Sequence, residues 1–295
     1  MRNNTSCAVR RLTAWGVVPI AFAVLLWGPS PALALPLLQS AQSFAVLGGS
    51  TVTNTGSTTL NGDLGVWPGS AIPGLGGITV NNGSTHITDA VAQQAQSDVT
   101  AAFVMLGIEP TTLDMTGTDL GTLATPLKAG VYRFTSAAAL TGTLTLDAEG
   151  NPNAVFIFQI GTSLDAATSS TVNVINGGGN TGVFWQVGTS ATLGTSSTFA
   201  GNILALDSIT VGTSARILCG RALARNGAVT LLGSNTISSN CNGGGDYSSG
   251  RSDFGSSGFS GGIEIVAPEP EPAVLVGIGL LSLLVFGRRP RNLVA

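Results

Sequence analysis

One eight-residue phrase occurs twice in this sequence, at two distant places. Residues 57–64 read STTLNGDL and residues 196–203 read SSTFAGNI, and the two align without a gap. Both alternate apolar and polar residues and break at a glycine corner, which is typical of short β-strands. A strand-and-corner unit that returns so far along the chain predicts that both copies belong to coils of one stack.

Longer copies of the same pattern follow in the second half of the chain. They begin at Val131, Val155 and Val183, and residues 209–224 repeat residues 192–205 with one insertion. Repeats of this size built from short strands predict a solenoid. The spacing between copies varies, so we expect irregular coils. Residues 57–64 then form a coil of the same stack, reached before a long interruption.

The interruption is a predicted helix at about residues 88–107. Thr88 is the expected N-cap, Asp89 lies in the first turn, and Gly107 ends the helix. Its apolar residues recur at helical spacing and give one stripe, consisting of Ala92, Ala95, Val99, Ala102, Phe103 and Leu106. We expect the stripe to cover the solenoid core, and it implies no cofactor.

Composition and the scarcity of reactive side chains argue against several functions. Only 9% of the residues are charged and the net charge is −3, so nothing indicates a nucleic-acid partner. The one histidine, His86, precedes the helix without a catalytic motif. Asp63, Asp165 and Asp207 are scattered near corners, as expected of turn residues. We therefore predict no enzyme, no catalytic residue and no metal site.

The two ends of the chain predict export. Residues 1–34 combine arginines, an apolar run and small residues before Leu35, which is typical of a signal peptide. Cys7 leaves with that segment, so we expect a disulfide between the remaining cysteines, Cys219 and Cys241. The folded domain is predicted at 35–241, followed by a Gly/Ser-rich linker at 242–267.

The last segment, residues 268–295, carries three features in order. These are Pro268-Glu269-Pro270, an apolar stretch at 273–286 that we expect to be a membrane helix, and a basic cluster. This order resembles the PEP-CTERM sorting tail of Gram-negative bacteria. The resemblance implies a transient inner-membrane anchor, processing by an exosortase, and delivery to the cell surface or the medium, often alongside exopolysaccharide.

The phrases of the domain also resemble a known family. FAVLGGSTVTNTGSTTLNGDLGV, VFWQVGTSATLGTSSTFAGNILALDSIT and GRALARNGAVTL are similar to the ice-binding-like β-solenoid proteins, and the likeness spans about residues 40–240. It implies a mainly β fold, an irregular right-handed parallel β-helix of triangular section, with one long α-helix packed alongside. It also implies that the N-terminal coil stacks beside late coils.

Four segments predict a flat threonine-rich face. If their apolar residues point inward, alternation leaves one outward set: Thr51, Thr53, Ser190, Thr192, Ser208, Thr210 and Thr230. Together with the resemblance, this grid predicts a monomer that binds ice or ordered water. A second face with Thr143, Thr145 and Thr171 is the alternative, ranked lower because we expect fewer coils to continue its pattern.

Two other functions remain open. A cell-surface or biofilm-matrix adhesin that binds polysaccharide would also suit the sorting tail, and a polysaccharide-active enzyme would use the scattered aspartates. Sugar sites use outward aromatic rings, and only Trp67 looks exposed in this sequence. The scarcity of exposed rings favours ice.

Overall fold

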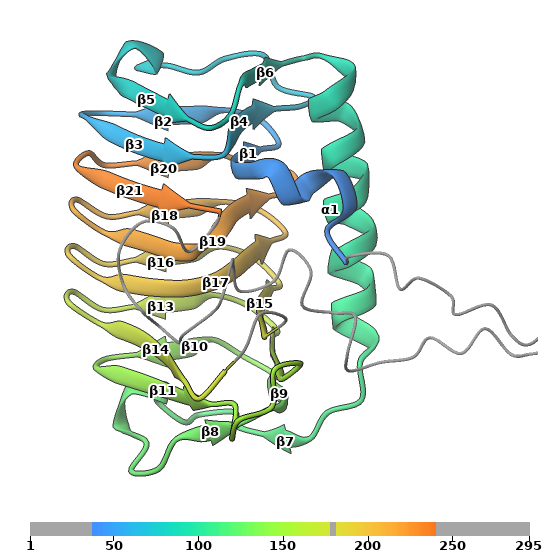
Figure 1. The fold of residues 1–295 in the computed structure, drawn as a ribbon, viewed down its shortest axis with the longest axis vertical. Helices are drawn as coiled ribbons and strands as arrows, with labels where there is room; N and C mark the ends of the chain where they lie inside the picture. Colours follow the sequence, from blue (N-terminus) through green and yellow to red (C-terminus); the bar gives the residue numbers. More distant parts are fainter. Residues whose placement is uncertain (1–36, 178–180, 240–295) are drawn as a thin grey trace, which may run out of the picture. The chain divides into compact units, whose positions relative to one another are not determined.

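The computed structural model describes residues 37–177 and 181–239, which form a β-solenoid with one long helix (Figure 1). Each coil passes through three faces in turn, and the strands of neighbouring coils pair in parallel. One face is covered by the helix and is called the helix face. The other two are called the narrow face and the broad face. The mainly β solenoid with a helix alongside is confirmed.

The narrow face is a separate six-stranded sheet whose strands have three residues each. Its order is β10-β13-β16-β18-β20-β2, so the first strand of the chain to join it lies beside the last. Its strands are β2 (Val52–Asn54), β10 (Ala138–Leu140), β13 (Leu164–Ala166), β16 (Ala191–Leu193), β18 (Ile209–Val211) and β20 (Val229–Leu231).

The broad face and the helix face share the larger sheet. The strands of the broad face are β3 (Thr58–Asn61), β5 (Ile78–Asn81), β8 (Leu127–Lys128), β11 (Thr143–Asp147), β14 (Thr171–Ile175) and β21 (Asn235–Ser238). Two long strands, β17 (Thr198–Ala205) and β19 (Arg216–Ala224), begin on the broad face and continue onto the helix face. Their pairing shifts register between Ala200 and Gly201, where the chain turns that corner.

The helix face completes each coil. Its strands are β1 (Phe44–Gly48), β4 (Asp63–Val66), β6 (Thr85–Ile87), β7 (Leu113–Asp114), β9 (Gly130–Phe134), β12 (Val155–Ile160) and β15 (Gly182–Val187). Three short 3₁₀ turns connect elements: η1 (Gln39–Ser43), η2 (Leu75–Gly77) and η3 (Leu120–Thr122).

The N-terminal coil stacks directly against the last coil. Strand β1 pairs with both β4 and β19, and β3 pairs with β21. Register therefore aligns Thr59 with Thr198 through Thr236 and Arg216. The glycines of the repeated phrase, Gly62 and Gly201, both have positive φ, 128° and 99°. The phrase recurs because both copies fill the same place in a coil, as predicted.

Helix α1 (Ala90–Ile108) carries the chain from one end of the stack to the other (Figure 1). Its 19 residues span about 28 Å. All six stripe residues are buried, and they belong to a cluster that includes outward side chains of the helix face, among them Leu47, Ile157, Phe184, Leu204 and Leu223. The predicted core-covering role is confirmed.

The predicted ends of the helix are off by one or two residues. The N-cap is Asp89, whose Oδ1 accepts a hydrogen bond from the Ala92 amide at 2.8 Å. Thr88 has a φ of 53°, and its hydroxyl donates to the Ile87 carbonyl instead. At the other end the helix continues past Gly107 to Ile108. Asp89 has the extended backbone conformation of an N-cap residue, with φ −96° and ψ 171°, whereas Thr88 is left-handed and its hydroxyl is engaged outside the helix.

Removing this cap should lower the melting temperature. The pKa of Asp89 is held below its ordinary value, first by the Ala92 amide and then by the hydrogen bond from His86. A lowered pKa in the folded state contributes stability above the ordinary carboxyl pKa, which is lost as pH falls through the folded value. Asp89→Ala should therefore melt below wild type at pH 7, with the difference narrowing as the pH falls below the ordinary carboxyl pKa.

The control for this cap is Thr88→Ala, which removes a hydroxyl that caps no helical amide. The Thr88→Ala protein should melt close to the wild-type temperature. Thermal unfolding followed by circular dichroism measures both variants. An Asp89→Ala deficit that stayed constant down to the acid limit would contradict the assignment.

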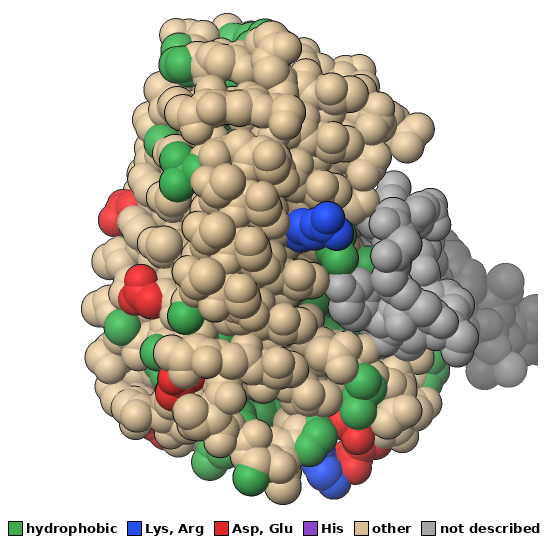
Figure 2. Space-filling view, turned by 90° about the vertical axis from the view of Figure 1, so that its left-hand side faces the viewer, with side chains coloured by type: hydrophobic (Ala, Val, Ile, Leu, Met, Phe, Trp, Pro, Cys, Tyr) green, Lys and Arg blue, Asp and Glu red, His purple; other side chains and the backbone are tan. Residues whose placement is uncertain are grey.

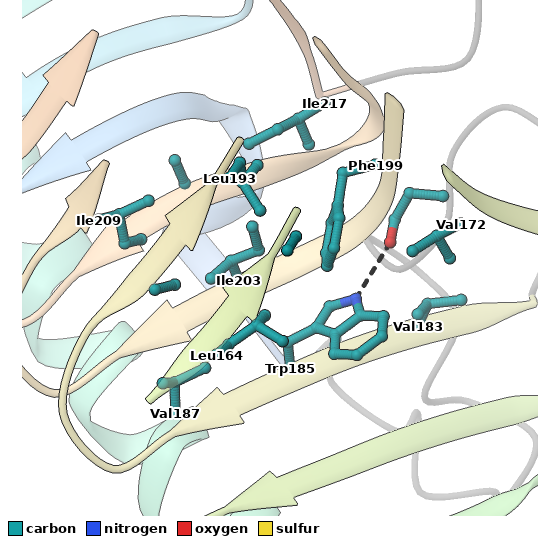
Figure 3. Packing of buried hydrophobic residues seen from close by; sticks show 14 of the residues in the cluster. Leu164, Val172, Val183, Trp185, Val187, Leu193, Phe199, Ile203, Ile209 and Ile217 are labelled. Atoms are coloured by element: carbon teal, nitrogen blue, oxygen red, sulfur yellow. Dashed lines mark hydrogen bonds between the residues drawn. The ribbon is translucent and has the colours of Figure 1, made fainter. Parts of the chain in front are cut away.

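Stacked side chains fill the interior. Tyr132, Phe158 and Trp185 lie in register on β9, β12 and β15, and the rings of Phe158 and Trp185 stack with centroids 3.9 Å apart. Phe199 packs on the other side of Trp185 at 4.8 Å. The Trp185 indole Nε1 donates to the Ala200 carbonyl at 3.1 Å (Figure 3). A large aromatic core thus supports the faces from inside.

Several predicted segments lie outside the described residues. These are residues 1–34, the linker at 242–267, and the tail at 268–295 with Pro268, Glu269 and Pro270. Within the described part of the chain, no helix is long and apolar enough to cross a membrane. Cys219 is buried and disulfide-bonded. Cys241 lies outside the described residues, so its pairing with Cys219 stays a prediction.

Candidate functional site

The narrow face carries an uninterrupted row of threonines. Thr53 pairs with Thr230, Thr230 with Thr210, and Thr210 with Thr192, each on an adjacent coil. The residues on either side of each threonine in its strand are buried, so the threonines point outward. Neighbouring strands are about 4.8 Å apart. The structure thus brings four of the five predicted threonines of this face into one row, and Thr51 lies outside it.

The row of threonines on the narrow face ends after Thr192, and other residue types continue it. After Thr192 come Asp165 on β13 and Ala139 on β10. Asp165 is exposed, and its Oδ2 accepts a hydrogen bond from Ser163 at 2.7 Å. The four-threonine segment is therefore bordered by a carboxylate on one side. The sequence pattern did not show that Asp165 lies next to Thr192, because this pairing runs across two strands.

The other three predicted residues lie beside the row rather than in it. The Ser190 Oγ accepts a hydrogen bond from the Ser208 amide at 3.3 Å, and the Ser208 Oγ accepts one from the Ala228 amide at 3.1 Å. The Thr51 carbonyl accepts from the Val229 amide, which places Ala228 next to Thr51. The hydroxyls of Ser190 and Ser208 are thus hydrogen-bonded to the backbone of the next coil. Ala228 separates Ser208 from Thr51, so these residues do not form a continuous line of hydroxyls.

The broad face carries a longer row that the sequence showed only in part. Thr143 and Thr171 are aligned with residues of five further strands. The complete row in spatial order is Thr79, Thr59, Thr236, Arg216, Thr198, Thr171 and Thr143. The expectation that fewer coils continue this pattern is wrong. Thr145, the third residue of the predicted alternative face, lies one row away, beside Asn173.

Arg216 interrupts the broad row at its centre. It is exposed and lies between Thr198 and Thr236 in register. A shared sequence signal could have found the row, because Thr59 and Thr198 occupy the same place in the repeated phrase. The sequence spacing did not reveal the other residues of the row, because corners of different length separate these positions along the chain.

The corner between the two exposed faces is also rich in hydroxyl groups. Four serines there have left-handed φ values and stand one above another: Ser169 (58°), Ser196 (57°), Ser214 (58°) and Ser234 (52°). Backbone hydrogen bonds of 2.9 Å join each of the first three to the next coil. Figure 2 shows that backbone and uncharged polar side chains cover most of this side of the solenoid.

The scattered acidic residues do not converge. Asp63 accepts a hydrogen bond from the Ser84 amide at 2.7 Å at the start of β4, whereas Asp165 lies on the narrow face. His86 contacts the helix cap Asp89 at 2.8 Å. In residues 37–177 and 181–239, no group of three His, Cys, Asp or Glu side chains is arranged to hold a metal ion.

Trp67 is less exposed than the sequence suggested. It is half-buried and packs against the cluster beneath α1, and its carbonyl accepts a hydrogen bond from Gln96 at 3.2 Å. The ring that looked available for stacking on a sugar thus helps to seat the helix.

Comparison with known proteins gives concordant matches. Residues 46–238 match the model of a family described as ice-binding-like. An ice-binding protein of Nostoc sp. (strain HG1) is 45% identical over 259 residues, which is 88% of this chain and 88% of that protein.

Solved structures give the same picture. The crystal structure of an ice-binding protein from an Antarctic biological consortium matches with a TM-score of 0.64 and 40% identity, covering 71% of this chain and 93% of that one. The ice-binding protein of the Antarctic ascomycete Antarctomyces psychrotrophicus matches with a TM-score of 0.64 and 41% identity, covering 68% and 96%.

Proposed function

Because this chain belongs to the ice-binding-like family, we propose that it binds ice, and that it does so through the narrow face. The observation that carries the choice of face is the row Thr53, Thr230, Thr210 and Thr192, which crosses four adjacent coils in register without a break. Adsorption at such a face would restrain the growth and recrystallisation of ice outside the cell.

The chemistry of the row suits ordered water. Successive hydroxyls lie about 4.8 Å apart across the strands, a spacing comparable with oxygen repeats on ice planes. Each threonine offers a hydroxyl that donates and accepts, next to a methyl group that occupies space between waters. Its branched Cβ restricts χ1, so little side-chain entropy is lost on binding. The narrow strands have no register shift, which keeps the grid regular.

The broad face is the weaker candidate despite its greater length. Arg216 divides its row into two runs of three threonines. An exposed guanidinium carries several hydrogen-bond donors and its own hydration. The narrow face has its charge, Asp165, beyond the end of the four-threonine segment.

We propose that the protein is exported and works as a monomer. Residues 1–34 would act as a signal peptide, and residues 268–295 as a sorting tail that reaches the inner membrane of a Gram-negative cell, is processed by an exosortase, and leaves the domain at the cell surface or in the medium. The pattern of charges and apolar residues in both ends supports this. Exopolysaccharide would be an accompanying partner, and no catalytic activity is proposed.

The direct test is whether the purified protein shapes growing ice crystals and inhibits recrystallisation. Faceted crystals and small grains are expected with the folded protein, and rounded crystals with the same protein after heat unfolding. Folded protein that leaves ice growth unchanged would overturn the proposal and favour the polysaccharide-binding adhesin.

A further inference from the structure

We propose that Arg216 decides which of the two threonine rows binds ice, by preventing the broad face from doing so. The inference rests on the proposed function, because it concerns the choice between two surfaces for the same ligand. It also predicts something that the proposed function does not require: one substitution on the broad face should create a second ice-binding surface.

The position of Arg216 is the first step. Of the seven aligned residues of the broad row, the other six are threonine, and three lie on each side of Arg216. No other site in the row departs from threonine. The row without Arg216 would be longer than the four-threonine segment of the narrow face.

The second step is the length and charge of the side chain. Arg216 is exposed, and it forms no salt bridge with any described residue that would draw it down onto the sheet. A threonine side chain ends two bonds beyond Cα, whereas an arginine side chain is several bonds longer and can reach well above its threonine neighbours. A flat ice surface that approaches the row therefore meets the guanidinium before it meets the hydroxyls on either side, and must displace its hydration.

Other charges on this side lie at the end of the stack. Lys128 and Glu149 form a salt bridge at 2.6 Å, and Asp147 accepts a hydrogen bond from Asn176 at 2.8 Å. Lys128 pairs with Asp147 between β8 and β11, at the edge of the sheet beyond the row. Lys128 and Asp147 thus lie on the last two strands at one end of the broad face, whereas Arg216 stands in the middle of the threonine row, so Arg216 is the residue whose removal should matter.

The experiment is a rescue. Four full-length proteins are compared for ice shaping and recrystallisation inhibition: wild type, Thr210→Tyr, Thr210→Tyr/Arg216→Thr, and Thr210→Tyr/Arg216→Lys. Thr210→Tyr should abolish shaping, because the ring projects from the centre of the narrow row. Adding Arg216→Thr should restore shaping through the broad face. Adding Arg216→Lys keeps a long charged side chain at the same place and should restore nothing.

A second readout identifies the surface. Fluorescently labelled Arg216→Thr protein, in which the threonine rows of both faces are uninterrupted, should bind to ice planes that the labelled wild-type protein does not bind. Melting temperatures should be close to that of wild type, since Arg216 is exposed and threonine suits a strand.

The outcomes separate this inference from the proposed function. If wild type is active, Thr210→Tyr is inactive, and Arg216→Thr restores nothing, the inference is overturned while ice binding stands. If Thr210→Tyr remains fully active, the choice of the narrow face is wrong, and Arg216 does not silence the broad face. If folded wild type does not shape ice, the proposed function itself fails.

Discussion

Thr192→Tyr/Thr210→Tyr is expected to abolish ice shaping and recrystallisation inhibition while the protein unfolds at the wild-type temperature. Both residues lie in the central row of the narrow face, on adjacent strands, and point away from the core. Two tyrosine rings would stand above the neighbouring threonines and keep a flat lattice from contacting Thr53 and Thr230. Tyrosine suits an exposed strand position, so the fold should be unaffected.

The matched control places the same change on the other face. Thr171→Tyr/Thr198→Tyr also alters two aligned threonines on adjacent coils, and it should leave ice shaping intact. Crystal morphology at a range of protein concentrations, measured with thermal unfolding of each variant, distinguishes the two. If the broad-face variant loses shaping and the narrow-face variant keeps it, ice binds to the broad face instead.

Trp185→Ala is expected to cause the largest loss of stability. The Trp185 side chain is fully buried between the rings of Phe158 and Phe199, and its indole nitrogen donates to the Ala200 carbonyl. Truncating a buried tryptophan to alanine costs about 3–5 kcal/mol, because transfer energy is lost and a cavity remains. Denaturant unfolding should show this loss as a lower midpoint.

Two comparisons make the Trp185 prediction specific. Trp67→Ala removes a half-buried ring beneath the helix and should cost clearly less. Trp185→Phe keeps most of the stack but removes the donor to Ala200, and should fall between alanine and wild type. A Trp185→Ala protein as stable as Trp67→Ala would show that the stacked rings do not hold the coils together.

The repeats predicted a solenoid, because each copy describes one place in a coil, whereas the stacking of the N-terminal coil beside late coils was implied by the resemblance to the family. Thr59 and Thr198 are aligned through β21 and β19, and the glycines of both copies turn the same corner. The helix was predicted from its stripe, and its ends were missed by one or two residues. Adjacent residues such as Thr88 and Asp89 are both good caps in sequence, and the left-handed backbone of Thr88, which excludes it as the cap, became visible only in the structure.

The candidate site was harder to predict because a row runs across the strands. Alternation within a strand shows which residues point outward, and it identified Thr53, Thr192, Thr210 and Thr230 correctly as outward. It does not show which residue of one coil faces which residue of the next. The inserted residue near Cys219 and the corners of unequal length shift the sequence spacing, so the contribution of Thr236 and the break at Arg216 became visible only through register.

The pairing of the N-terminal coil with the last coil has a consequence for how the chain reaches its native state. Strands β1 to β3 are made first, yet their partners β19, β20 and β21 are made last. Contacts of such long sequence separation form slowly. Although β1 pairs with β4 and β3 with β5 early on, a chain emerging N-terminus first leaves the other side of this opening coil unpaired until nearly the whole domain has been synthesised. The last three strands therefore complete the fold by joining the exposed side of the first coil, so that loss of β21 would leave β3 and β19 each without one of their partners.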